Sequence, residues 1–197
     1  MPRAGVDMQK IIRVAIDITE ETGIETLTLK EISKRLNVSS ASLYNHVNNL
    51  AEVKDKVSHA VLEMLKELIL RGIIGKSGTD LIRAIGRVYI GFAQEHPYLY
   101  ETIQWVNVWA DTSSQDIFSD IMRLAGEEGS KMGMTEVESN HIIRCLRCLV
   151  HGFASIEGHD GFGYKVSAQD SFEYALDMFI LGISTKLKQE RAKLPKE

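Results

Sequence analysis

At 197 residues, with 44% hydrophobic and 25% charged side chains, the chain has the composition of a globular protein rather than a disordered one. No stretch approaches the roughly 20 apolar residues of a membrane span or forms a secretory signal, and Cys145 and Cys148 make no disulfide framework, so we expect a reducing, cytoplasmic location without a membrane partner. The net charge of −4 excludes a strongly basic nucleic-acid binder, so any DNA-binding function must be argued from the residue pattern.

Helical periodicity begins close to the N-terminus, and strand patterns are nearly absent. A first helix is predicted from about Asp7 to Thr22, with Gly23 just past its end. Residues 28–31 (Thr-Leu-Lys-Glu) form a capping-box pattern that opens a second helix, which ends near Leu36. The next residue, Asn37, suits the left-handed position that often follows a helix.

A third, very short helix is predicted next, capped by Ser39 or Ser40 and reaching His46. Two helices joined by about four residues, the second only about two turns long, have the geometry of a helix-turn-helix. The exposed residues of the short helix are small and polar, so its backbone can approach base edges and its hydroxyl and amide groups can form hydrogen bonds there. Leu43 and Val47 are predicted to point inward and to hold this helix against the preceding one.

The remaining chain also reads as helices. Asn49 can cap a fourth helix of roughly two dozen residues, which we expect to leave the N-terminal unit and enter a second one. A second capping-box pattern starts at Thr135. These signals predict an all-α fold with nine helices. A three-helix helix-turn-helix head occupies residues 1–50 and a six-helix bundle occupies 51–197, with its later helices at about 79–95, 98–105, 114–131, 136–157 and 168–192.

The segment from Gly23 to Val47 resembles the TetR family of transcriptional regulators. The residues that carry this resemblance are Gly23, Thr28, Ile32, Leu36, Val38-Ser39 and Leu43-Tyr44-Asn45-His46-Val47. The resemblance implies a DNA-binding head, a linking fourth helix and a divergent ligand-binding bundle that dimerises through its last two helices. It implies a regulator, expected to be a repressor, that binds a palindromic DNA operator as a homodimer and is released by a small apolar or aromatic effector. No catalytic motif or cofactor motif is found, so we predict no enzyme activity and no cofactor.

Carried onto this sequence, the resemblance implies both base-facing and phosphate-contacting side chains. Each assignment leaves a simpler interpretation open: Tyr44 could brace the turn, His46 could pack or cap, and the lysines could form an ordinary solvated face. The predicted DNA-contacting residues are Thr28, Lys30, Ser39, Ser40, Ala41, Ser42, Tyr44, Asn45, His46 and Lys54.

One departure from the family concerns Leu50. The family usually has a lysine at this position, where it pairs with a phosphate. Lys54, one turn later, either compensates for the change or leaves DNA affinity weaker than is typical. Residues 1–58 also carry eight basic and eight acidic side chains, so the head is neutral. Both features favour a rival interpretation, a TetR-like adaptor whose DNA contacts are secondary.

The bundle is interpreted as a sensor because aromatic and methionine residues concentrate between residues 89 and 122. Ordinary core packing is the alternative for each of them. Residues 149–153 (Leu-Val-His-Gly-Phe) resemble a TetR subfamily named for a Trp-His-Gly motif, with Val150 in place of the tryptophan. The predicted ligand-binding residues are Tyr89, Phe92, Trp105, Trp109, Met122, Cys148 and His151.

The spacing of His141, Cys145, Cys148 and His151 suggests metal or thiol sensing, and the first three share one side of a predicted helix. One straight helix cannot surround a tetrahedral zinc ion with all four side chains, so no metal site is assigned. A thiol or metal sensor stays an alternative function, and ordinary core cysteines are a further interpretation.

The last two helices have broad apolar faces, which predict a four-helix dimer interface between two copies of the chain. The sequence does not separate the residues that face the partner from those that face the core. They are Ile142, Leu146, Leu149, Phe153, Tyr174, Met178, Leu181 and Ile183.

Overall fold

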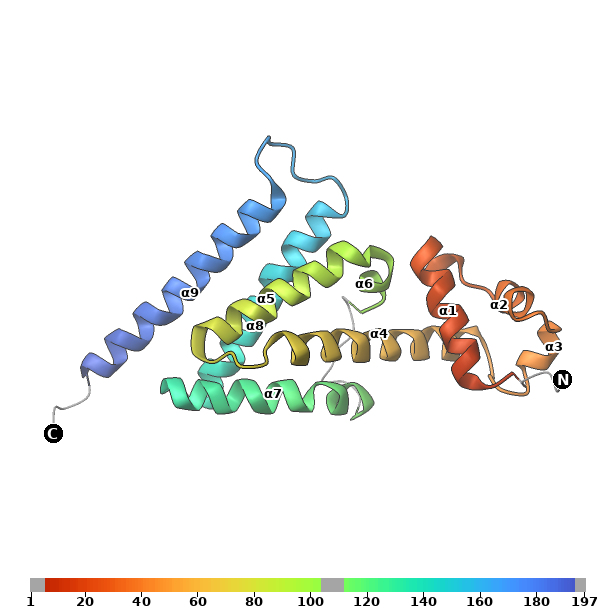
Figure 1. Ribbon diagram of the computed structural model, residues 1–197, viewed down its shortest axis with the longest axis horizontal. Helices are drawn as coiled ribbons and strands as arrows, with labels where there is room; N and C mark the ends of the chain where they lie inside the picture. The colour runs from red at the N-terminus through yellow and green to blue at the C-terminus, as the bar shows by residue number, and fades with distance from the viewer. Residues whose placement is uncertain (1–5, 104–111, 194–197) are drawn as a thin grey trace. The chain divides into compact units, whose positions relative to one another are not determined.

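The computed structural model describes residues 6–103 and 112–193, and all regular elements within these ranges are helical. The predicted all-α class is therefore confirmed, and the nine α-helices in the described ranges match the predicted number. In chain order the elements are α1 (Met8–Thr22), the 3₁₀ helix η1 (Ile24–Thr26), α2 (Leu29–Leu36), α3 (Ser40–Leu43), α4 (Leu50–Gly72), α5 (Gly78–Glu95), α6 (Pro97–Ile103), α7 (Thr112–Met132), α8 (Glu136–Glu157) and α9 (Ala168–Lys193) (Figure 1).

The chain divides into two compact units, and the division falls inside α4, between Met64 and Leu65. The first unit, called the head below, contains α1 to α3, the start of α4, and α6. The second unit, called the bundle, contains the end of α4 together with α5, α7, α8 and α9. The predicted boundary at residue 50 divides a DNA-binding region from a ligand-binding and dimerisation region, and this division of functions stays a prediction. Across the described residues, none of the helices combines the length and the hydropathy needed to cross a membrane.

Local capping fixes the first two helices; Thr28 was the predicted cap of α2, whereas the prediction began the first helix at Asp7, which proves to be its cap. Asp7 caps α1 by accepting a 2.8 Å hydrogen bond from the Lys10 backbone N–H. Thr28 caps α2 by accepting from the Glu31 N–H at 3.1 Å, and Asn37 ends that helix in the left-handed region with φ 54° and ψ 47°. A short polar side chain such as Asn tolerates this conformation better than most residues, because it can bond locally. The chain therefore turns sharply out of α2.

The prediction for the third helix was wrong in length, since α3 ends at Leu43 rather than at His46. Past that point the backbone bonds shift to closer partners: Asn45 N–H reaches Ser42 O at 3.4 Å, and His46 N–H reaches Leu43 O at 2.8 Å. Such bonds tighten the chain into a 3₁₀-like turn. Tyr44, Asn45 and His46 consequently lie on a turn instead of on a second helical turn.

The head has its own apolar core. Ile11, Ile18, Ile32 and Leu43 are almost completely buried, and Val47 is 2% exposed. The inward orientation predicted for Leu43 and Val47 is confirmed. Burying an aliphatic side chain of this size stabilises a fold by about 1.5–3 kcal/mol, so these few residues hold a short α3 in place.

The bundle core lies where α5, α8 and α9 meet. Leu146, Val150, Phe172 and Leu176 are buried within it. α8 opens with the full capping box predicted at Thr135, in which Thr135 and Glu138 exchange side-chain-to-backbone bonds. Two ion pairs cross from α5 to α9 at its surface, Arg83–Asp177 and Arg87–Glu173. The bundle thus combines an apolar core with ion pairs at its surface.

Candidate functional site

The serines at the start of α3 bond to one another and to α2. Ser39 caps the helix, and its Oγ lies 2.8 Å from Ser42 Oγ. Ser40 Oγ lies 2.9 Å from the Oγ of Ser33, which is buried on α2 and donates to the Lys30 carbonyl. A hydroxyl has one donor and two acceptor sites, so each of these serines keeps capacity for a further partner. The bonds also fix the angle between the two helices of the motif.

The face of this motif that points away from the head core is the candidate nucleic-acid interface. Tyr44 is 60% exposed although it neighbours the fully buried Leu43. Ala41, Asn45 and His46 are exposed as well. A small methyl, an amide and a phenol side by side can contact a thymine methyl, a base edge and a phosphate. The structure thus leaves these four predicted residues accessible to solvent, and their contact with DNA stays a prediction.

The basic side chains near this surface differ in whether they already form ion pairs with carboxylates of the same chain. Arg35 forms a bidentate salt bridge with Glu21 on α1, with N–O distances of 2.7 and 2.6 Å. These hydrogen bonds raise the pKa of the arginine. Lys54 Nζ lies 3.3 Å from Glu25 Oε2, so a phosphate at Lys54 would compete with this carboxylate. Lys30 and Thr28 are exposed on α2 and at its cap. Lys30 is thus accessible to solvent, and its contact with a DNA backbone stays a prediction.

In the bundle, two of the predicted ligand residues contact each other. Tyr89 Oη on α5 lies 3.2 Å from His151 Nε2 on α8, with the two rings edge to face. Arg147 Nε donates to the same His151 nitrogen at 3.1 Å, so that nitrogen acts as an acceptor and the ring is neutral. Desolvation, and then the charge of Arg147, lower the pKa of His151 to about 4, while burial raises the pKa of Tyr89 to about 12.

This lowered pKa predicts a pH-dependent stability. The unfolded chain binds a proton at His151 near pH 6.5, whereas the folded chain resists protonation down to about 4, so stability should fall as the pH drops through this window. We expect about 1 kcal/mol of loss between pH 7.5 and 5, less than the full shift implies because the ring is partly solvated. Urea unfolding at both pH values measures the free energy of unfolding. In His151→Gln its change between the two pH values should be smaller by this amount than in the unchanged protein.

A matched control for this measurement is His141→Gln, because His141 lies on the same helix and is exposed. It should keep the pH dependence of the unchanged protein. Equal pH dependence in His151→Gln and in the unchanged protein would contradict the role of His151.

The other predicted ligand residues are scattered. Phe92 is 2% exposed on α5, Met122 is half-buried on α7, and Cys148 is exposed on α8. Trp105 and Trp109 lie outside the described residues. Of the predicted residues that the structure describes, none lines the cavity between α5, α7 and α8 or the groove between α8 and α9. The assignment of a ligand site to this set stays a prediction.

Sequence reasoning missed the residues that line a cavity between α5, α7 and α8, among them Ser139 and Glu128. A signal was available in the sequence of α8. Its inward positions, Ser139, Leu146 and Val150, form one helical stripe in which the serine is the polar exception.

The cysteines are not core residues, contrary to one interpretation of their spacing. Cys145 and Cys148 are both exposed on α8. His141 is exposed on the same side, and His151 is engaged by Tyr89 and Arg147. Within residues 6–103 and 112–193, no three His, Cys, Asp or Glu side chains are placed so that they could hold a metal ion.

Within one chain, the apolar residues of α8 and α9 differ in burial. Leu146 and Ile183 belong to the core of the bundle. Tyr174, Met178 and Leu181 lie on α9 and are 70%, 52% and 58% exposed. Isolated exposed apolar residues are common, but these three recur at helical spacing on one helix, and a contact with a partner subunit there stays a prediction.

Comparisons with known proteins agree with this architecture. The family described as "Tetracyclin repressor-like, C-terminal domain" matches residues 82–179. The "Uncharacterized HTH-type transcriptional regulator YobS" of Bacillus subtilis (strain 168) is 26% identical over 92% of this chain and 95% of its own length. A protein of unknown function from Rhodococcus sp. RHA1 shares the fold with a TM-score of 0.76 and 16% identity, over 92% of this chain and 98% of its own. A TetR variant from Acinetobacter baumannii AYE, solved with minocycline, matches at 0.70 and 17%, over 93% and 99%.

Head and bundle together, with these relatives, define a transcriptional regulator of the helix-turn-helix class. The chain belongs to the TetR family. The finer assignment, to the subfamily with a Trp-His-Gly motif, stays a prediction.

Proposed function

We propose that the protein is a ligand-responsive repressor that binds a palindromic DNA operator as a homodimer and is released by a small effector. The observation that carries the proposal is the surface around α3, where Tyr44 and Asn45 are exposed beside a buried Leu43. Two such surfaces in a two-fold dimer would meet half-sites about one helical turn, or a multiple of it, apart.

The exposed row on α9 supports the homodimer. Met178, the middle residue of this row, lines a groove of about 370 Å³ between α8 and α9. A second copy of α8 and α9 would cover this surface and complete a four-helix interface. Dimerisation would also double the number of DNA contacts, which a head with few unpaired cations needs.

Chain connectivity supports ligand control. Helix α4 starts in the head and ends in the bundle, and α6, which lies between two bundle helices in sequence, belongs to the head. Within the head, His96 at the start of α6 contacts Glu20 of α1 at 2.9 Å. An effector that favours one arrangement of the bundle can therefore act on the head through both helices. By linkage, DNA lowers effector affinity by the same factor.

A salt titration of operator binding tests the DNA-binding proposal. With about 6–8 phosphate contacts per dimer, the logarithm of the association constant should fall with the logarithm of salt concentration at a slope near −6. DNA fragments enriched by the purified protein, with and without cell extract, would supply the operator for fluorescence anisotropy. Binding that does not respond to salt would contradict the proposal.

A second candidate function, a TetR-like adaptor with secondary DNA contacts, is favoured by two observations. Leu50 replaces the usual phosphate-binding lysine, and the neighbouring Lys54 is paired with Glu25. The double variant Tyr44→Ala, Lys30→Ala should abolish operator binding and gene regulation together. Tyr164→Ala, at another exposed tyrosine, serves as the control. Regulation that survives in the double variant without DNA binding would establish the adaptor instead.

A further inference from the structure

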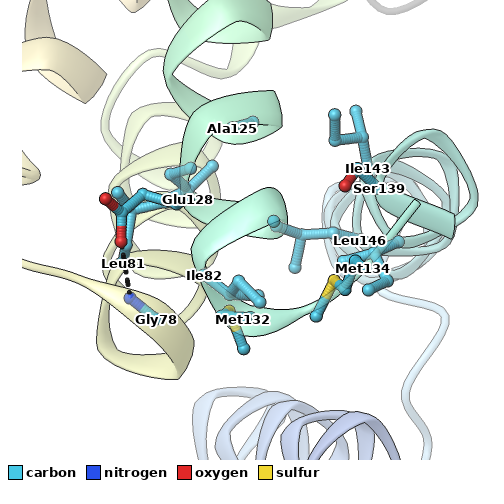
Figure 2. Close-up of a pocket in the computed structure, with 13 residues that line it drawn as sticks. Gly78, Leu81, Ile82, Ala125, Glu128, Met132, Met134, Ser139, Ile143 and Leu146 are labelled. Atoms are coloured by element: carbon cyan, nitrogen blue, oxygen red, sulfur yellow. Dashed lines mark hydrogen bonds between the residues drawn. The ribbon is translucent and has the colours of Figure 1, made fainter. Parts of the chain in front are cut away.

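A cavity of about 40 Å³ lies inside the bundle, between the start of α5, the end of α7 and the start of α8 (Figure 2). Its wall is mostly aliphatic, and two flexible methionines, Met132 and Met134, close one side. The aliphatic residues are Leu81, Ile82, Ile85, Ala125, Ile142, Ile143 and Leu146. Such a wall favours an apolar ligand.

Two polar side chains interrupt this wall, and they differ in whether they have hydrogen-bond partners. The Glu128 carboxylate is satisfied, since it accepts from the Gly78 N–H at 3.1 Å and pairs with Lys131, as the dashed line in Figure 2 partly shows. Ser139, across the cavity on α8, is 7% exposed, and its Oγ has no hydrogen-bond partner among the described residues. Buried hydroxyls normally have a partner, so this one needs an explanation.

The fold makes room for the unpartnered hydroxyl. α7 approaches α8 at Gly129, where a Cβ atom would come within 2.1 Å of Ser139 Oγ. A serine at this position therefore depends on a glycine opposite it, and it leaves a buried polar group unsatisfied. An alanine would avoid that cost, because it removes the polar group altogether. A bound molecule that supplies the missing hydrogen bond accounts for both residues.

We propose that this cavity is an effector site that takes a small, uncharged aliphatic molecule with one hydrogen-bonding oxygen, such as a short alcohol or ketone, which Ser139 recognises. None of the described residues that line the cavity carries a positive charge, and the Glu128 carboxylate disfavours an anion. The volume is well below the roughly 150 Å³ that holds a benzene ring, so the ligand is limited to about three or four non-hydrogen atoms. This proposal rests on the proposed function for its regulatory meaning, but the binding itself is tested separately.

The test uses the full-length protein labelled with ¹³C at the methionine methyl groups, titrated with ethanol and, as a charged control, with acetate. Ethanol should shift the Met132 and Met134 signals, assigned with Met→Leu variants, and leave the exposed Met178 unchanged. Ser139→Ala should weaken ethanol binding about 2- to 10-fold, the loss of one hydrogen bond, while raising the Tm of the free protein. Ser155→Ala, at an exposed serine of α8, should change neither quantity.

Two outcomes would overturn the site: acetate binding as tightly as ethanol, or Ser139→Ala keeping full affinity for ethanol. Ala125→Leu, which fills the cavity from α7, provides a second check and should abolish the methionine shifts. Operator binding measured with and without ethanol separates this proposal from the proposed function. Release of DNA by cell extract without any ethanol binding would reject the cavity alone. Ethanol binding in a protein that fails to bind DNA would reject the repressor alone.

Discussion

Replacing Leu181 by glutamate should convert the proposed dimer into monomers and lower operator affinity by at least about 100-fold. The side chain is 58% exposed on α9, so the substitution should leave the fold of one subunit intact. In a dimer it would be covered by the partner, and an unpaired buried charge is strongly unfavourable. Sedimentation velocity and fluorescence anisotropy measure the two expected effects.

Ile74→Glu is the matched control, because Ile74 is an exposed apolar residue that follows α4 and lies far in sequence from α8 and α9. It should leave both mass and affinity unchanged. A Leu181→Glu protein that sediments as a dimer would show that the exposed row on α9 is not the interface.

Truncating Leu43 to alanine should abolish operator binding, because α3 would no longer be held in place against the head core. Leu43 is fully buried, and α3 has only one turn of its own to hold it. Large-to-small changes of this kind cost about 2–5 kcal/mol, a large part of the stability of a small unit. Urea unfolding followed by tyrosine fluorescence gives the loss of stability, and anisotropy gives the loss of DNA binding.

A Leu→Ala change at Leu68, a partly exposed position on α4, controls for side-chain volume. There the loss should stay within about 0.5 kcal/mol, and operator affinity should not change. Normal DNA binding by Leu43→Ala would mean that α3 is held by contacts other than its buried leucine.

Local signals predicted much of the fold. The caps at Thr28 and Thr135 and the left-handed Asn37 are all present, because each depends on a few neighbouring residues. The end of α3 was not predictable in the same way. It depends on whether the backbone N–H groups of Asn45 and His46 donate to carbonyls three or four residues back. They donate to Ser42 and Leu43, three residues back, and helix propensity alone does not predict this choice.

The site residues were harder to predict, since they depend on contacts between distant helices. Periodicity placed Leu146 and Leu181 on apolar faces, but only the packing shows that the first is buried and the second exposed. The contact of Tyr89 with His151 joins positions that are 62 residues apart. The unpartnered Ser139 hydroxyl likewise arises from the approach of Gly129 on another helix.

The brevity of α3 has a consequence for how an operator would be read. A helix of four residues, with its serines already bonded to each other and to Ser33, offers few side chains per half-site. Discrimination among sequences would then depend strongly on groove width and on the ease of bending the duplex. Base pairs that no side chain touches should therefore still influence affinity, most of all those between the two half-sites.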